Sequence, residues 1–255
     1  MDDKRKIIAI CGKGGVGKTS ISAIVLQYLI DRKKTVLAID ADPAVGLSTS
    51  IGITPKKTVD DIRNDLILNI EKKTIGSKSE MLSNLEYDLF NALEESKDFS
   101  FLAIGRPEKQ GCYCQINHLL KDIIGSIAKN FSYVVIDCEA GLEQVNRRVL
   151  EKVTHLLLIS DLSKKSLDVA SDIAELSRKV INFKKIGLLV NKIKNKNEAA
   201  LLAVPENLNS IGWIPEDDII RSYDIEGKDI LTLRHSPSVY AVSQAMDEFL
   251  DFVPG

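Results

Sequence analysis

The sequence has few cysteines, no long apolar run and no large excess of charge of either sign. It contains only four cysteines in 255 residues, too few for a disulfide framework. No apolar run approaches the ~20 residues that a membrane-spanning helix requires, and no apolar region typical of a secretory signal precedes the first strand-like run. The formal net charge of −2 argues against a dedicated binder of nucleic acid or anionic membrane. These absences predict a cytoplasmic protein with reduced thiols.

Apolar segments of strand length alternate along the chain with segments of helical character. Most are continuously apolar, which is typical of strands buried on both faces. The expected strands are 7–11, 35–39, 99–104, 133–137, 155–160, 186–191 and 210–214. The expected helices are 18–31, 115–129, 143–151, 164–181 and 197–204, with a last helix that begins at Ser236-Pro237 and runs to about Phe252.

This alternation predicts an α/β fold: a doubly wound, mostly parallel sheet of about seven strands with helices on both faces. A hydrophobic content of 44% allows a substantial core. No repeat or linker divides the chain, so residues 1–255 are expected to form a single domain. Residues 54–98 are polar and weakly periodic, and we expect helices and loops there.

Residues 12–19 read Gly-Lys-Gly-Gly-Val-Gly-Lys-Thr and satisfy the phosphate-loop pattern G-x-x-x-x-G-K-[ST]. An expected strand precedes this segment and an expected helix follows it. The glycines let N–H groups turn inward around an anion, and the helix N-terminus adds its positive dipole end. We expect Lys18 to reach the β- and γ-phosphates and the Thr19 hydroxyl to bind Mg²⁺. The strand–loop–helix context disfavours the alternative of a glycine-rich turn before an ordinary helix.

Acidic residues follow two of the expected strands. Asp40 and Asp42 come after strand 35–39, and Asp137 ends strand 133–137. Ligands of open α/β sheets bind at the carboxyl ends of strands, where an aspartate beside a phosphate loop holds Mg²⁺ directly or through water. A single aspartate in such a place is often only a turn former, but two of them beside a phosphate loop predict a magnesium site.

Lys13 lies inside the loop and is not required by the general pattern. With it, the sequence resembles the deviant Walker A ATPases, the group that includes MinD, ParA, ArsA and the nitrogenase iron protein. The resemblance implies an ATP-dependent homodimer in which Lys13 crosses a two-fold interface to the partner's nucleotide. The implied reaction is in-line attack of water on the γ-phosphoryl group of ATP, catalysed by Lys13, Lys18 and Asp42.

The same resemblance assigns further residues. Asp42 corresponds to the switch I aspartate that orients water, and Thr19, Asp40 and Asp137 to the Mg²⁺ site. Glu139 and Gly141 fall in switch II. Asn191 matches an adenine-contacting asparagine, for which a simple turn residue is the alternative. The full set of implied nucleotide-binding residues is Gly12, Lys13, Gly14, Gly15, Val16, Gly17, Lys18, Thr19, Ser20, Asn191, Lys192 and Pro215.

A cysteine pair, Cys112 and Cys114, is the second informative feature. Residues two apart can direct both thiols to one side and so supply half of a tetrahedral thiolate site. A two-fold partner would complete it as Cys₄, and His118 is an alternative ligand. Cys11 and Cys138 lack a second paired motif and are expected to be small apolar residues near the nucleotide site. An uninvolved, reduced pair is the remaining alternative.

The segment around this pair, residues 105–114, reads Gly-Arg-Pro-Glu-Lys-Gln-Gly-Cys-Tyr-Cys. It resembles the CooC/AcsF subfamily, as do residues 137–143. Members of this subfamily are maturation ATPases for the nickel enzymes carbon monoxide dehydrogenase and acetyl-CoA synthase. The resemblance implies one Ni²⁺ or Zn²⁺ per dimer, bound by Cys112 and Cys114, with ATP/ADP and Mg²⁺ as cofactors and a nickel enzyme as client.

The phosphate loop also suits two other functions: a positioning ATPase of MinD or ParA type, and an ATP-driven electron donor. A MinD-type positioning ATPase needs a basic amphipathic C-terminal helix, whereas residues 246–252 are acidic. A ParA-type ATPase needs DNA binding, for which only the basic run 178–196, with seven Lys or Arg and no acid, is available. An electron donor like the nitrogenase iron protein takes one cluster cysteine from each of two loops, which the adjacent pair fits less well.

Overall fold

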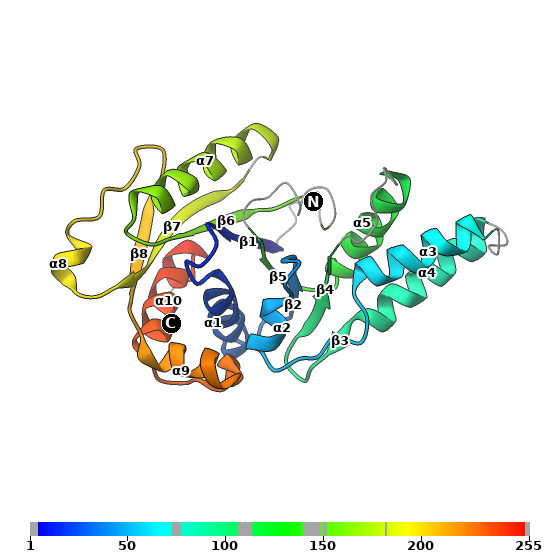
Figure 1. Ribbon diagram of the computed structural model, residues 1–255, viewed down its shortest axis with the longest axis horizontal. Coiled ribbons are helices and arrows are strands. Elements are labelled where there is room, and N and C mark those ends of the chain that lie inside the picture. The colour runs from blue at the N-terminus through cyan, green and yellow to red at the C-terminus, as the bar shows by residue number, and fades with distance from the viewer. Residues whose placement is uncertain are drawn as a thin grey trace.

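The computed structural model describes residues 5–72, 78–106, 114–139, 149, 152–181 and 183–252, with residues 78, 79, 114 and 180 described by their backbone alone. Its centre is an eight-stranded sheet in the order β3-β4-β2-β5-β1-β6-β7-β8 (Figure 1). The strands are β1 (Lys6–Gly12), β2 (Val36–Asp40), β3 (Glu94–Glu95), β4 (Ser100–Ala103), β5 (Tyr133–Asp137), β6 (His155–Ser160), β7 (Lys185–Ile193) and β8 (Ser210–Pro215).

The sheet confirms the predicted fold class. Seven strands coincide with the seven expected ones within two residues at each end, and all their pairings are parallel. The additional strand is β3, which pairs antiparallel with β4. Its two residues are too few to show any hydrophobic periodicity, which is why the sequence did not indicate it.

Helices cover both faces of the sheet. They are α1 (Lys18–Asp31), α2 (Gly46–Ser50), α3 (Val59–Glu71), α4 (Lys78–Ala92), α5 (Cys114–Ala128), α7 (Lys164–Val180), α8 (Lys196–Ala199), α9 (Asp218–Glu226) and α10 (Pro237–Phe249), with a 3₁₀ turn at Ile230–Thr232. The region 54–98 contains the α3–α4 hairpin, which extends beyond the edge of the sheet (Figure 1).

One expected helix is shorter than predicted, and another lies outside the described residues. The expected helix 197–204 is only the single turn α8, because the turn segment that follows leads to Pro205. The expected helix 143–151 lies outside the described residues, apart from Val149. The last helix begins as predicted: the Ser236 hydroxyl caps it by accepting a hydrogen bond from the Val239 N–H (3.1 Å), and Pro237 takes the first helical position.

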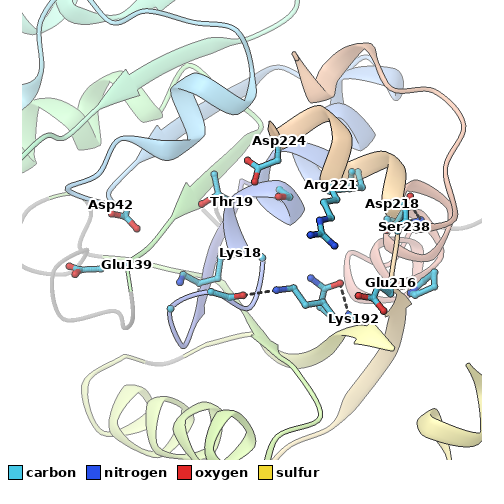
Figure 2. A pocket seen from close by; sticks show the side chains of 18 residues that line it. Lys18, Thr19, Asp42, Glu139, Lys192, Glu216, Asp218, Arg221, Asp224 and Ser238 are labelled. Carbon is cyan, nitrogen blue, oxygen red and sulfur yellow. Dashed lines mark hydrogen bonds between the residues drawn. The ribbon is translucent and has the colours of Figure 1, made fainter. Parts of the chain in front are cut away.

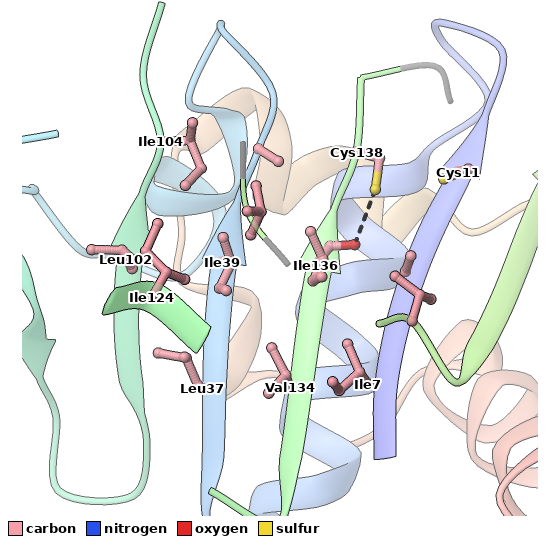
Figure 3. Packing of buried hydrophobic residues seen from close by; sticks show 14 of the residues in the cluster. Ile7, Cys11, Leu37, Ile39, Leu102, Ile104, Ile124, Val134, Ile136 and Cys138 are labelled. Atoms are coloured by element: carbon pink, nitrogen blue, oxygen red, sulfur yellow. Dashed lines mark hydrogen bonds between the residues drawn. The ribbon is translucent and has the colours of Figure 1, made fainter. Parts of the chain in front are cut away.

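Successive side chains of β1 point to opposite faces of the sheet, and both faces are covered by helices. This explains why residues 7–11 are apolar throughout. Ile7, Ala9 and Cys11 pack in one core layer, with residues of α3, α4, α5 and α7. Ile8 and Ile10 pack in the other layer, with residues of α1 and α10. Figure 3 shows the first layer, in which side chains of neighbouring strands lie side by side. A strand buried on both faces in this way places the loop that follows it at the middle of the sheet edge.

No helix among the described residues is long and apolar enough to cross a membrane. The basic run 178–196 does not form one surface, because its members lie at opposite ends of the nine-residue strand β7. Arg178 and Lys179 end α7, whereas Lys194 and Lys196 follow the carboxyl end of β7. The Arg178 guanidinium donates to the Asn207 carbonyl (2.7 Å), and Lys179 pairs with Glu175 (2.8 Å).

Candidate functional site

The predicted phosphate loop connects β1 to α1 at the carboxyl edge of the sheet. Gly12, Gly15 and Gly17 have φ values of 152°, 81° and 92°, in the region that side chains disfavour. Gly12 also lies against β6, since a Cβ there would be 2.1 Å from the Ile159 carbonyl oxygen. Glycine at these positions therefore permits the tight path from β1 into the helix N-terminus. The buried Lys18 turns its ammonium toward the Lys13 carbonyl (3.3 Å).

A cavity of about 660 Å³ opens beside this loop (Figure 2). It is lined by Gly14, Gly15, Gly17, Lys18, Thr19, Ser20, Asp42, Glu139, Asn191, Lys192, Pro215, Glu216, Asp217, Asp218, Ile220, Arg221, Asp224 and Ser238. The structure thus brings together most of the predicted nucleotide-binding residues. Within the described loop, Gly12, Lys13 and Val16 do not line the cavity: Gly12 and Val16 are buried beneath it, and Lys13 is half-buried.

Asp40 and Asp137 lie beneath the loop as fully buried carboxylates. They are register partners at the ends of β2 and β5. Burial, with the charge of Asp137 added to it, raises the pKa of Asp40 to about 7, although the backbone N–H groups of Asp42, Ser48 and Leu47 lower it. Burial also raises the pKa of Asp137 to about 6, against the opposing effect of the Thr19 and Ser22 hydroxyls. Such a pair is stabilised by a cation.

The two oxygens of Asp137 differ in their surroundings. Oδ1 accepts a hydrogen bond from the Ser22 hydroxyl (2.9 Å). Oδ2 is buried and accepts none from the described residues. An acceptor left open in this way, next to Thr19 and under the phosphate loop, fits a Mg²⁺ ion or one of its water ligands. Asp40 holds the start of α2 instead, because its Oδ2 accepts from the Leu47 N–H (2.9 Å).

Asp42 and Glu139 face the cavity from the side of β2 and β5 (Figure 2). The Asp42 carboxylate accepts a hydrogen bond from the Ala44 N–H (2.8 Å), which orders the turn after β2. Gly141, the predicted end of switch II, lies outside the described residues. The carboxylates that can act on a γ-phosphate and its water therefore stand on one side of the loop.

Asn191 and Lys192 stand on the other side, at the end of β7. The Asn191 amide donates to the Val16 carbonyl (2.8 Å), and the Lys192 ammonium donates to the Gly15 carbonyl (2.8 Å). Both residues line the cavity, together with Pro215 at the end of β8. The expected contact of Asn191 and Pro215 with a base remains a prediction.

The sequence did not predict the wall of the cavity formed by α9 and the two residues before it. This wall carries Glu216, Asp217, Asp218, Arg221 and Asp224. Asp217 caps α9 through the Ile219 N–H (3.0 Å) and also accepts from the Ser238 N–H at the start of α10 (3.0 Å). The signal was present in part, because Glu216, Asp217 and Asp218 directly follow β8 at the carboxyl edge of the sheet, as Asp42 and Glu139 closely follow β2 and β5.

The cysteine pair predicted to bind metal lies mostly outside the described residues. Cys112 lies outside the described residues, and Cys114 is the first residue of α5. Among the described residues, no group of three or more His, Cys, Asp and Glu could hold a metal ion. His118 is exposed on α5, with Nε2 3.7 Å from the Asp122 carboxylate. Cys11 and Cys138 are buried in the core (Figure 3), as expected of small apolar residues.

The cysteine pair is flanked by two anchored segments. Before it, the Ile104 N–H donates to the Asp40 carbonyl and the Asp60 N–H donates to the Ile104 carbonyl, both at 2.9 Å. After it, the Asn117 side chain on α5 accepts from Arg63 Nε (2.9 Å). The Arg63 side chain is only 5% exposed and lies 3.8 Å from the Asp60 carboxylate. Backbone and side-chain contacts thus run from Asp40 to both flanks of the cysteine segment.

Comparison with known proteins agrees with this geometry. A profile of the CobQ/CobB/MinD/ParA nucleotide binding domain matches residues 7–230. The uncharacterized ATP-binding protein MJ0685 of Methanocaldococcus jannaschii is 38% identical over 237 residues, which cover 92% of this chain and 94% of that protein. The carbon monoxide dehydrogenase accessory protein CooC of Rhodospirillum rubrum is 27% identical over 230 residues, which cover 86% of this chain and 87% of that protein.

Among solved structures, the septum site-determining protein MinD of Pyrococcus horikoshii, complexed with Mg-ADP, has a TM-score of 0.66 at 19% identity. The match covers 96% of this chain and 95% of that one, and it shows a shared fold. The family-level resemblance inferred from the phosphate loop is thereby confirmed. The chain belongs to the CobQ/CobB/MinD/ParA family of nucleotide-binding domains.

Proposed function

We propose that this protein is an ATP-hydrolysing metallochaperone that assists nickel insertion into carbon monoxide dehydrogenase or acetyl-CoA synthase. In this proposal an ATP-dependent homodimer binds one Ni²⁺ or Zn²⁺ through Cys112 and Cys114 of both copies. The observation that carries it is the presence of a closely spaced cysteine pair in a nucleotide-binding chain that is similar to CooC along 86% of its length.

The site supports hydrolysis of the γ-phosphoryl group. Water attacks the γ-phosphorus in line, the bond to the β,γ-bridging oxygen breaks, and ADP and phosphate leave. Lys18 and the loop N–H groups neutralise charge on the phosphates, and Asp42 orients the water. Mg²⁺, when bound, supplies further charge neutralisation beside Thr19, Asp40 and Asp137.

The position of Lys13 supports a role at the nucleotide bound by the partner subunit. Lys13 belongs to the phosphate loop but, of the described residues, is not among those that line its own chain's cavity. A half-buried lysine at the rim of one site is free to serve the nucleotide of a two-fold partner. The expected consequence is hydrolysis that depends on protein concentration.

The flanks of the cysteine segment support coupling between nucleotide and metal. If Asp40 moved when the dimer closed, the backbone hydrogen bonds of Ile104 would transmit the movement to Asp60, near the start of α3. The same helix carries Arg63, which binds Asn117 on α5. Closing the dimer would then change the separation of the two cysteine pairs, and with it the affinity for metal.

The metal would be held by thiolates, so binding releases protons and weakens at low pH. Thiolates bind Zn²⁺ tightly and do not select Ni²⁺ over Zn²⁺ by softness alone. The metal that copurifies is therefore a poor guide to the physiological one, and delivery to a client must be tested directly.

The decisive experiment is an anaerobic titration of the full chain with Ni²⁺ and Zn²⁺, in the presence of ADP or a non-hydrolysable ATP analogue, with dimer state followed by light scattering. The proposal expects one metal per dimer and an affinity that differs between the nucleotides. The variant Cys112→Ala/Cys114→Ala should lose the metal and keep nucleotide binding, whereas the control Cys11→Ala/Cys138→Ala should keep the metal. Metal binding unaffected by loss of Cys112 and Cys114 would refute it.

A further inference from the structure

The outer face of helix α4 carries two large aromatic side chains that are exposed. Tyr87 is 68% exposed and Phe90 is 61% exposed. Because they lie three positions apart, they share one side of the helix. Leu85 and Leu89 are buried on the other side and pack with residues of α3 and α5. The helix is anchored through one face and leaves an aromatic patch on the other, which is typical of a surface that binds another molecule.

This patch belongs to a stripe that has no charge at its centre. Exposed residues of α4 recur at a spacing of three or four positions: Glu80, Ser83, Asn84, Tyr87, Phe90 and Asn91. In this stripe, here named the α4 face, only the residue at one end is acidic. Protein–protein interfaces have the same organisation, with aromatic residues enriched and charged residues depleted at the centre.

The surroundings of the α4 face are negative. Residues 79–96 contain five acidic residues and no Lys or Arg, although the whole chain is nearly balanced, with 34 basic and 36 acidic residues. One of the five, Glu94, pairs with Lys56 (3.0 Å). Glu86 is exposed, and no cation among the described residues pairs with it. It precedes Phe90 by four positions, so its carboxylate lies directly beside the aromatic patch.

The α4 face lies next to the helix that carries a cysteine of the predicted metal pair. The buried side of α4 packs against α5, whose first residue is Cys114. The other helix of the hairpin is also tied to α5, because Arg63 donates to Asn117 (2.9 Å). The hairpin projects from one end of the sheet, whereas α9 and α10 lie at the other end, with β8 (Figure 1). A partner bound to α4 would therefore sit beside α5 and leave the nucleotide cavity open.

The charge around the α4 face selects among possible partners. A second copy of this chain, bound through a two-fold axis, would set the acidic face against itself, and like charges across an interface are unfavourable. Nucleic acid and anionic membranes carry the same sign of charge and are repelled. A protein surface that is apolar at its centre and surrounded by Lys and Arg complements the α4 face in both respects.

We propose that the α4 face docks the client enzyme, at a client surface that is apolar in its centre and basic at its edges. The inference deepens the proposed function, on which the identity of the partner rests. Tyr87 and Phe90 become buried at the centre of the contact, and Glu86 faces basic side chains of the client. Docking at this place holds α5, and with it the cysteine segment, beside the enzyme that receives the metal.

The probes are metal-free carbon monoxide dehydrogenase and metal-free acetyl-CoA synthase, with binding to the full chain followed by biolayer interferometry. The wild-type protein should bind one of them, and Tyr87→Ala/Phe90→Ala should weaken that binding at least about 30-fold, as for lost hot-spot aromatics. Tyr240→Ala is the matched control, since Tyr240 on α10 is 67% exposed and should contribute nothing. Equal affinity of the double variant and the wild type would overturn the inference, and so would a wild type that binds neither enzyme.

A second measurement tests the charge of the partner. Glu86→Lys should lower the association rate, and added salt should slow association of the wild type more than that of the variant. Glu206→Lys, which reverses an exposed charge between α8 and β8, should leave the rate unchanged. A rate that Glu86→Lys leaves unchanged or increases would overturn the inference, because the partner was chosen by its charge.

Nickel transfer from the loaded protein to the metal-free enzyme separates docking from delivery. Tyr87→Ala/Phe90→Ala should need a higher concentration for half-maximal transfer and reach the wild-type rate at saturation, with unchanged metal and MgADP affinity. Unchanged half-saturation would overturn docking at α4 while delivery stands. A wild type that binds the client through Tyr87 and Phe90 and transfers no nickel would refute the proposed delivery and support the docking face. Loss of dimerisation in the double variant would assign the face to a second copy and overturn the inference.

Discussion

Asp40 and Asp137 are register partners at the carboxyl ends of neighbouring parallel strands, and the side chains of both are fully buried. Two carboxylates in such a place repel one another, and burial raises the pKa of each. Asp137 Oδ2 in addition accepts no hydrogen bond from the described residues. The site therefore holds unfavourable negative charge that a divalent cation would relieve.

Asp137→Asn is expected to remove the dependence of nucleotide affinity on magnesium. The change keeps the size of the side chain but removes the charge beneath Thr19. Affinity for MgADP should fall about 10- to 100-fold, as for other residues that support a bound metal. Affinity for ADP measured by calorimetry in excess chelator should stay close to that of the unchanged protein. An equal loss with and without magnesium would mean that the substitution damages the loop itself.

Gly17→Ala is expected to destabilise the protein for two separable reasons. A side chain at φ 92° is strained by about 1–2 kcal/mol, and its Cβ would lie 2.5 Å from Asn191 Nδ2. In urea unfolding, the double variant Gly17→Ala/Asn191→Ala should be more stable than the two single effects summed, since the clash is relieved and the strain remains. Gly14→Ala, where a Cβ has no neighbour within 4 Å, is the control. Additive effects would show that the clash contributes nothing.

His155 is expected to make stability fall between pH 6.5 and about 4. Burial, together with the charges of Lys6 and Lys185, lowers the pKa of His155 to about 4. Below pH 6.5 the unfolded chain takes up a proton that the folded chain does not, so the folded state loses stability until the pH reaches the folded pKa. The loss is of the order of 3 kcal/mol.

His155→Gln, which does not titrate, serves as the comparison for this effect. The difference in unfolding free energy between the two proteins, measured by urea at pH 7 and at pH 4.5, should change by most of that amount. The ring also packs edge-on against Phe249 (5.5 Å between centroids), so the variant loses some stability at every pH. Parallel pH profiles would contradict the prediction.

Arg63 and Arg234 offer a matched pair of arginines. The Arg63 side chain is 5% exposed and binds Asn117, whereas Arg234 pairs with Asp31 at 56% exposure. Arg63→Met should destabilise the protein by about 3 kcal/mol or more, because it leaves buried polar groups without their partner. Arg234→Met should cost less than about 1 kcal/mol. Thermal unfolding of both variants decides the point, and similar shifts in melting temperature would show that Arg63 is not held as described.

The sheet was predictable because its strands carry the strongest signal a sequence can have. Strands 133–137 and 155–160 are apolar at every position except Asp137, His155 and Ser160, and the structure buries every residue of both strands. The phosphate loop was predictable because its geometry demands glycine at particular positions. The position of Asp137 at the end of its strand followed from the same pattern of apolar runs. The binding of magnesium there remains a prediction.

Other features depend on contacts between distant segments. A bulge at Asn191 and Lys192 exists only through the pairing of β7 with β8, and no local pattern marks it. The α9 wall was indicated only in part: Glu216 and Asp217 directly follow the expected strand 210–214, whereas the helix α9, which carries Arg221 and Asp224, was not expected. The hydrophobic pattern of α3 and α4 was weak because only part of each helix surface is buried. The large side chains of Tyr87 and Phe90 on α4 are exposed.

The position of β1 has a consequence for synthesis of the chain. β1 pairs with β5 on one side and β6 on the other, and Gly12 is paired with Ile159. A ribosome that has made the phosphate loop must therefore translate well over a hundred further residues before both neighbours of β1 are available, a wait of several seconds or more at about 5–20 residues per second. Until then the central strand is an exposed apolar edge that invites wrong partners. The phosphate loop therefore leaves the ribosome long before both strand neighbours of β1, and it reaches its final form only after they have arrived.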